Sequence, residues 1–255
     1  MRGFMVFCRK ELTESYRSYR LVILLVVMAL MGIMSPFTAM ILPDILSGSD
    51  LGGGLILELP EPTSFDSWTQ FFSNVSQMGM LAMILVFAGL MASELSKGTL
   101  IPVLTKGIPR GTVILAKFTV ATILWSLGYA VSWIICWGYT IYYWGAQDFT
   151  HPWITFCAPW LVGELFLALM ILGGTLVSNW GGSLGVVAVV VITGNLVNLL
   201  PEVRPYNPIT LAAGTLGLLD GSHSVEDFTP AIAICVGAIV LCLILSIVVF
   251  KRKQL

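Results

Sequence analysis

The chain has 255 residues, of which 57% are hydrophobic and 11% charged, with a formal net charge of −1 and a mean hydropathy of +0.91. This composition is too apolar and too poor in charge for a soluble globular domain, and it indicates an all-α protein that crosses a membrane several times. The five cysteines show no CxxC spacing, which argues against a disulfide framework or a zinc site.

Residues 1–20 precede the first long apolar run and are predicted to form an amphipathic helix at the membrane interface. Apolar and aromatic side chains recur three or four residues apart on one face, whereas Arg9, Lys10, Glu14 and Arg17 lie elsewhere. The apolar face comprises Phe4, Phe7, Cys8, Leu12, Tyr16 and Tyr19. The alternative is that the first membrane span simply begins early.

Six apolar runs are long enough to cross a bilayer, and we predict that they are the six spans. They cover residues 21–42, 72–93, 113–143, 153–177, 183–200 and 230–250. The first run is too long for the apolar core of a signal peptide, so we expect it to remain in the protein. Pro36 is expected to kink this span.

The distribution of basic residues predicts the topology. Of the 13 Lys and Arg residues, 12 fall on the side that carries both termini, and only Arg204 falls on the other. Because Lys and Arg concentrate in cytoplasmic loops, both termini are expected in the cytoplasm. The acidic stretch 43–70 then lies outside, as does the segment 201–229.

The outer segment 201–229 contains an apolar stretch, Ile209 to Leu219, that is too short to span the bilayer. We predict a re-entrant or interfacial helix there. Asn207 is expected to cap this helix, and Pro208 to occupy its first position.

The sequence motifs of several enzyme classes are absent from this chain. HExxH, GxSxG and paired aspartates within spans are absent, and so is the GxxxxGK[ST] loop that holds ATP. No catalytic, metal or cofactor residue is therefore expected here, and nucleotide-driven work needs an ATPase on another subunit. Glu164 is the one acid deep in a predicted span, where it either couples protons, bonds to Ser, Thr or Trp of a neighbouring span, or lines a polar pathway.

The loop 94–112 between the second and third spans is basic and rich in turn-forming residues. Its sequence resembles the segment after the second span of ABC-2-type transporter permeases, E-x-x-x-G-T-L followed by L-x-K-P-I-x-R and a later G/A-K. The matching residues are Glu94, Gly98, Thr99, Leu100, Leu104, Lys106, Ile108, Arg110, Ala116 and Lys117. The family's usual Lys-Pro is Lys106-Gly107 here, with a proline at Pro109.

The resemblance implies the permease half of a type-2 ABC exporter in the bacterial plasma membrane. A coupling helix over Glu94–Thr105 would sit in a groove of a separate cytoplasmic ABC ATPase, which would carry ATP and Mg. A second permease chain, identical or different, would complete the pump, with the first and fifth spans at the interface. The residues implied in ATPase coupling are Glu94, Lys97, Gly98, Thr99, Leu100, Lys106 and Arg110, although topology alone also accounts for the cations.

The pathway residues are expected among methionines of the first two spans and polar groups of the fourth and fifth. The candidates are Met28, Met31, Met83, Glu164, Asn195 and Asn198. Methionine surfaces adapt to varied apolar ligands, with ordinary packing as the alternative. The cargo could equally be an antimicrobial or other amphipathic peptide, a lipid or a drug. Membrane lipids are expected to contact the chain, and no nucleic acid is expected as a partner. The competing reading is a membrane scaffold or sensor that recruits a cytoplasmic partner through the same loop.

Overall fold

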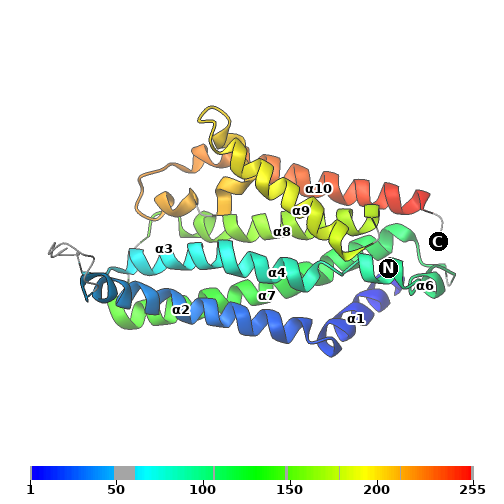
Figure 1. Cartoon of the computed structure of the whole chain (residues 1–255), viewed down its shortest axis with the longest axis horizontal. Helices are drawn as coiled ribbons and strands as arrows, with labels where there is room; N and C mark the ends of the chain where they lie inside the picture. Colours follow the sequence, from blue (N-terminus) through cyan, green and yellow to red (C-terminus); the bar gives the residue numbers. More distant parts are fainter. Residues whose placement is uncertain are drawn as a thin grey trace.

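The computed structural model describes residues 2–48, 61–105, 107–146, 149–177, 179–212 and 214–253. Across these ranges the regular elements are helices, without strands. Six of the described segments are long and apolar enough to cross a membrane, and Figure 1 shows the long helices side by side in one bundle. The expected all-helical class with six candidate spans is confirmed.

The first two helices meet at a sharp turn. Helix α1 covers Arg2–Arg17, and α2 covers Arg20–Gly48. The turn at Ser18 and Tyr19 separates them, and Tyr19 has a φ of 59°, a conformation that ends a helix. Helix α2 continues through both Pro36 and Pro43, so it extends beyond the predicted end of the first span. Residues 49–60 of the predicted acidic stretch lie outside the described residues.

The second span begins earlier than predicted because a capping box starts it. It consists of α3 (Ser64–Asn74), a π-helical turn η1 (Val75–Gly79), α4 (Met80–Phe87) and, after a turn, α5 (Ala92–Ser96). The Asp66 carboxylate accepts hydrogen bonds from the Thr63 backbone N–H and hydroxyl at 2.8 and 2.7 Å. This arrangement satisfies free groups at the helix start.

The remaining long helices differ strongly in how much of their surface is covered. They are α7 (Arg110–Trp144), α8 (Pro152–Val177), α9 (Trp180–Val197) and α10 (Thr229–Arg252), and the short α6 (Ile101–Thr105) precedes them. In the most apolar window, 78% of the residues of α8 are buried, against 11% for α9. Helix α8 is therefore central, and α9 presents most of its surface outward.

Glycines allow α8 and α9 to approach closely, as their small size predicts. A Cβ atom on Gly173 would lie 3.0 Å from the Gly182 carbonyl oxygen and from the Ser183 Cα. By contrast, a Cβ on Gly185 would meet nothing within 4 Å, so Gly185 has no part in this contact.

In the described part of the segment between α9 and α10, short 3-10 helices stand where we predicted one helix. They are η2 (Arg204–Tyr206), η3 (Pro208–Ala212), η4 (Gly214–Leu218) and η5 (Val225–Asp227). Pro208 does begin η3, and the Asn207 side-chain oxygen accepts a hydrogen bond from the Ile209 N–H at 3.1 Å. In Figure 1 this orange segment lies at the opposite end of the bundle from the two termini.

Candidate functional site

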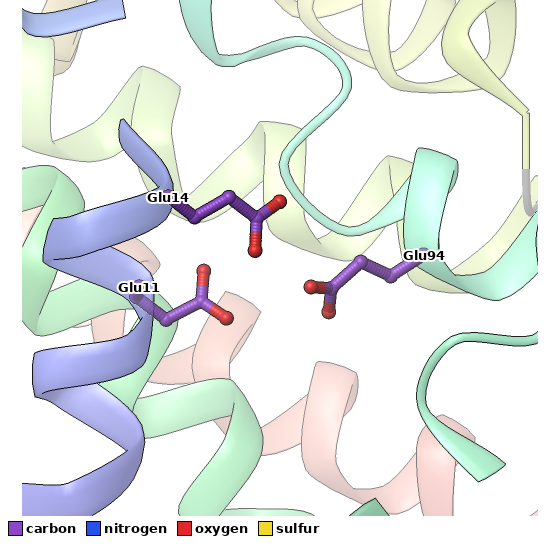
Figure 2. Close-up of side chains that lie close together, drawn as sticks. All are labelled: Glu11, Glu14 and Glu94. Carbon is purple, nitrogen blue, oxygen red and sulfur yellow. The ribbon is translucent and has the colours of Figure 1, made fainter. Parts of the chain in front are cut away.

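Five charged side chains gather at the end of the bundle that holds both termini, and we call them the charge cluster. Its members are Lys10, Glu11 and Glu14 of α1, Glu94 of α5 and Lys117 of α7. Figure 2 shows the carboxylates of Glu11 and Glu14 turned toward that of Glu94 across the space between α1 and α5. The charge cluster thus joins three segments that are far apart in the sequence.

The two lysines each pair with more than one carboxylate. The Lys117 ammonium lies 2.9 Å from Glu11 Oε2 and 2.8 Å from Glu94 Oε2. The Lys10 ammonium lies 2.9 Å from Glu11 Oε1 and 2.9 Å from Glu14 Oε2, and it also pairs with Glu94 Oε1. The side chains of Lys117 and Glu11 are only 1% and 2% exposed, so this pair is removed from solvent.

The spacing on α1 explains how acids reach the interior. Phe7, Glu11 and Ser15 recur every four residues, and all three are buried, which places them on the face of α1 that packs on the bundle. Both ammonium groups also lie near the Phe7 ring, at 5.2 Å for Lys10 and 5.9 Å for Lys117 from its centroid. This placement adds a cation–π contribution to the ion pairs.

Because its ion pairs are largely buried, the charge cluster holds α1, α5 and α7 in place relative to one another. Removing ions from water is costly, and the cost is offset only where the partners are well placed. Burial lowers the pKa of the Lys10 ammonium, but its hydrogen bonds to Glu94, Glu14 and Glu11 raise it more, so that pKa lies above its ordinary value. The three carboxylates are close enough to hold a metal ion, but two ammonium groups already lie among them. The chemistry is that of an ion-pair network.

The turn after Glu94 gives the E-x-x-x-G-T-L pattern a structural reason. Gly98 has a φ of +67°, the Thr99 N–H donates to the Glu94 carbonyl at 3.1 Å, and the Gly98 N–H donates to the Leu95 carbonyl at 3.3 Å. These bonds form a Schellman motif, which requires a left-handed residue where the helix ends. Leu100 follows and is 1% exposed. The single helix expected over Glu94–Thr105 is therefore wrong in form, because the turn at Gly98 divides it into α5 and α6.

The basic residues of the loop have different surroundings. Lys97 is exposed, and among the described residues no carboxylate lies within ion-pair distance of it. Arg110 donates from Nη1 to the carbonyls of Phe250, Lys251 and Lys253 at 2.6, 2.9 and 2.7 Å, so it caps the end of α10. Lys106 lies outside the described residues. Of the described cations that the resemblance implies in ATPase coupling, Lys97 is therefore the one that neither pairs with a described carboxylate nor bonds to the end of α10.

The pathway candidates fall into two groups. Met28 and Met83 are fully buried in the core of this one chain, and Met31 is half-buried. Burial of Met28 and Met83 agrees with the alternative in which these methionines serve ordinary packing. Glu164 is buried and accepts a hydrogen bond from the Thr122 hydroxyl of α7 at 2.6 Å, which is the bond to a neighbouring span among the alternatives.

Asn195 and Asn198 lie elsewhere. Both line a cavity of about 790 Å³ next to η2–η4.

Sequence reasoning did not identify three members of the charge cluster. Lys10 and Glu14 were predicted to lie away from the apolar face of an interfacial helix, and Glu11 was given no role. The available signal was the position of Glu11, four residues from both Phe7 and Ser15. An acid at that spacing on an otherwise apolar face indicates a buried partner.

The fold and the site define a class, an all-helical protein with six candidate membrane spans and an ion-paired cluster at one end. The chain belongs to the family described as a protein of unknown function (DUF2705), whose model matches residues 55–255. A comparison with curated proteins found no match. The matched region includes Glu94 and Lys117, whereas the α1 residues of the charge cluster precede it.

Proposed function

We propose that this chain is the membrane-spanning permease subunit of an ATP-driven ABC exporter in a bacterial plasma membrane. Two permease chains and two cytoplasmic ABC ATPase subunits form the working pump, and both termini of this chain lie in the cytoplasm. ATP and Mg bind to the ATPase. The observation that carries the proposal is the charge cluster, which attaches the loop between the second and third spans to α1 and α7.

A loop that transmits force must be firmly attached to the helices it moves. Here Glu94, at the start of the loop, pairs with Lys117 in the first turns of α7 and with Lys10 of α1. A displacement of the loop therefore acts on both helices, because separating the pairs would leave charges buried without partners. This is the mechanical connection that an external ATPase requires.

The exposed tip of the same loop is suited to contact the ATPase. Lys97, Pro102 and Thr105 are exposed, and Ile101 is 45% exposed, whereas Glu94 and Leu100 are anchored inside. In this proposal α5 and α6 together form the coupling element in place of one coupling helix. Helix α1 is the interfacial elbow, with Met5, Val6 and Tyr16 exposed toward lipid.

The remaining parts of the proposal concern the cargo side. The outward surface of α9 provides room for the second permease chain, and η2–η4 form the re-entrant outer segment. The cargo is an amphipathic or apolar molecule: an antimicrobial or other peptide, a lipid or a drug. Export of such peptides would confer resistance on the cell.

The test is co-expression with a bacterial ABC ATPase, chosen by inspecting the coding sequences that neighbour the one for this chain, followed by purification of the complex and uptake measurements. Inverted vesicles are supplied with ATP and with a fluorescent peptide, a fluorescent lipid and a fluorescent drug in turn. We expect assembly and ATP-dependent uptake of one of them. Lys97→Glu should reduce both assembly and uptake severalfold by repelling the acidic side of the ATPase contact.

Lys251→Glu is the matched control, since Lys251 is an exposed cation whose carbonyl accepts a hydrogen bond from Arg110, the residue that begins α7 after the loop. It should leave assembly and uptake unchanged. Stable assembly without uptake of any probe, and without an effect of the chain on ATP hydrolysis, would favour the membrane scaffold or sensor instead.

A further inference from the structure

A cavity of about 790 Å³ lies away from the charge cluster, between α3–α4, α8, α9 and the turns η2–η4. We propose that this cavity binds an acidic amphiphile, a molecule with a phosphate or carboxylate head and an alkyl chain. The proposal goes beyond the exporter function, because it concerns binding by one chain and holds whether or not the bound molecule is transported. Its volume falls within the range of about 300–1,000 Å³ that small-molecule sites occupy.

Two walls of the cavity change from polar to apolar along their helices. On the second span, Thr69, Ser73 and Gln77 line the cavity at four-residue intervals, and Leu81 and Ile84 follow deeper along the helix. Residues at this spacing share one face of a helix.

On the opposite wall, formed by α9, the apolar lining residue comes first along the chain and the polar ones follow. Val191 is apolar, and Asn195 and Asn198 follow it toward η2. Ser76 of η1 donates a hydrogen bond to the Ala212 carbonyl of η3, which places the polar part of the first wall beside the turns as well. The polar halves of both walls therefore meet at the η2–η4 end, and the apolar halves meet deeper in the bundle.

The helix geometry at the polar wall is unusual. The π-helical turn η1, Val75–Gly79, interrupts the second span where it borders the cavity. π-helical turns are rare in proteins, and those that do occur are often found at functional sites. Here both Ser76 and Gln77 line the cavity although they are adjacent in the sequence.

The charge of the lining selects the sign of the head group. Arg204 lies at the η2 end and is the one charged side chain among the lining residues, none of which is acidic. Within the described part of the chain, no carboxylate lies within ion-pair distance of Arg204. A guanidinium beside amide groups suits phosphate or carboxylate, which accept charge-assisted hydrogen bonds.

The opposite end of the cavity suits an alkyl chain. Val162 and Phe166 of α8 form its floor, and Met80 and Ile84 of α4 its side. Leu81 lines the cavity and is 51% exposed, so the cavity opens sideways along α4 toward the surrounding membrane. An amphiphile could enter from the bilayer with its head at Arg204 and its chain against α8.

The experiment measures equilibrium binding of radiolabelled dodecyl phosphate to the purified chain in phosphatidylcholine nanodiscs, with empty nanodiscs subtracted. We expect saturable binding of one molecule per chain. Arg204→Gln should weaken binding about tenfold or more, because a charge-assisted bond is lost. Arg252→Gln is the matched control, since Arg252 is an exposed cation in the last turn of α10 that does not line the cavity, and it should bind as the native chain does.

A second pair of variants tests the apolar end. Leu81→Trp should obstruct the cavity and weaken binding about tenfold. Leu85→Trp changes a residue of the same helix that is 52% exposed and does not line the cavity, so it should bind normally. Both leucines face outward, so neither change disturbs the core.

Competitors decide the ligand chemistry. Unlabelled dodecyl phosphate should displace the probe, whereas dodecyltrimethylammonium and inorganic phosphate should not. If phosphatidylglycerol in the nanodiscs displaces the labelled dodecyl phosphate, the natural ligand is a membrane lipid. If it does not, the natural ligand is a single-chain amphiphile. Equal competition by inorganic phosphate or by the cationic amphiphile would overturn the proposal. So would equal binding by the native chain and Arg204→Gln, or equal loss in Leu81→Trp and Leu85→Trp.

Discussion

Lys117 is the most buried cation of the charge cluster, and its removal tests whether the pairs stabilise the fold. Lys117→Met keeps the apolar length of the side chain but leaves Glu11 and Glu94 with Lys10 as their shared partner. Breaking one side of a buried pair typically costs about 3–5 kcal/mol. We therefore expect a decrease of that order in the free energy of unfolding, measured by reversible denaturation in mixed micelles.

Two further variants make this measurement specific. Lys251→Met removes an exposed cation and should change the free energy of unfolding by less than about 0.5 kcal/mol. The double variant Glu11→Gln with Lys117→Met should destabilise less than the sum of the two single variants, because the residues interact. Strict additivity, or a native-like stability of Lys117→Met, would show that the cluster does not hold α1 and α7 together.

At the scale of the element, Gly98 determines how α5 ends and how the loop turns toward α6. Its φ of +67° is disfavoured for residues with a Cβ, at a cost of roughly 1–2 kcal/mol. Gly98→Ala should therefore loosen the Schellman motif. Amide hydrogen exchange in the segment 95–100 is expected to be about tenfold faster.

Gly138 of α7 provides the control for this change. A Cβ there would meet nothing within 4 Å, and its φ is not in the left-handed region, so Gly138→Ala should leave exchange in the loop unchanged. Unaltered exchange in Gly98→Ala as well would contradict the requirement for a glycine at this turn.

The elements themselves were predictable to different degrees. The apolar runs predicted the six long segments, because a bilayer-length stretch of apolar residues has few other uses. The early start of α3 was missed, although Thr63 and Asp66 form the spacing of a capping box. The 3-10 form of η3 and η4 could not be predicted from local propensity, since it depends on packing against α8 and on the bond from Asn207 to the Gly194 carbonyl.

For the whole molecule, the sequence indicated the loop but not what anchors it. Glu94 and Gly98 were predicted as site residues, whereas Lys117 stood in the same sequence pattern without a predicted role. Glu11 was not predicted, because the partners of an α1 residue lie about 80 to 110 positions further along the chain, and such contacts leave no periodic signal. The cavity beside Arg204 escaped prediction for the same reason, since eight separate elements, α3, η1, α4, α8, α9, η2, η3 and η4, contribute its lining.

In the proposed exporter, the charge cluster transmits the action of an ATPase from the loop into the spans. The most direct test is the rate of ATP hydrolysis by the purified complex with Glu94→Gln, compared with the native complex and the ATPase alone. Gln keeps the size of the side chain while removing its charge, and Lys97 at the contact surface is unchanged. We expect Glu94→Gln to assemble normally but to hydrolyse ATP at the rate of the isolated ATPase. Native-like stimulation of hydrolysis by the assembled Glu94→Gln complex would contradict this expectation.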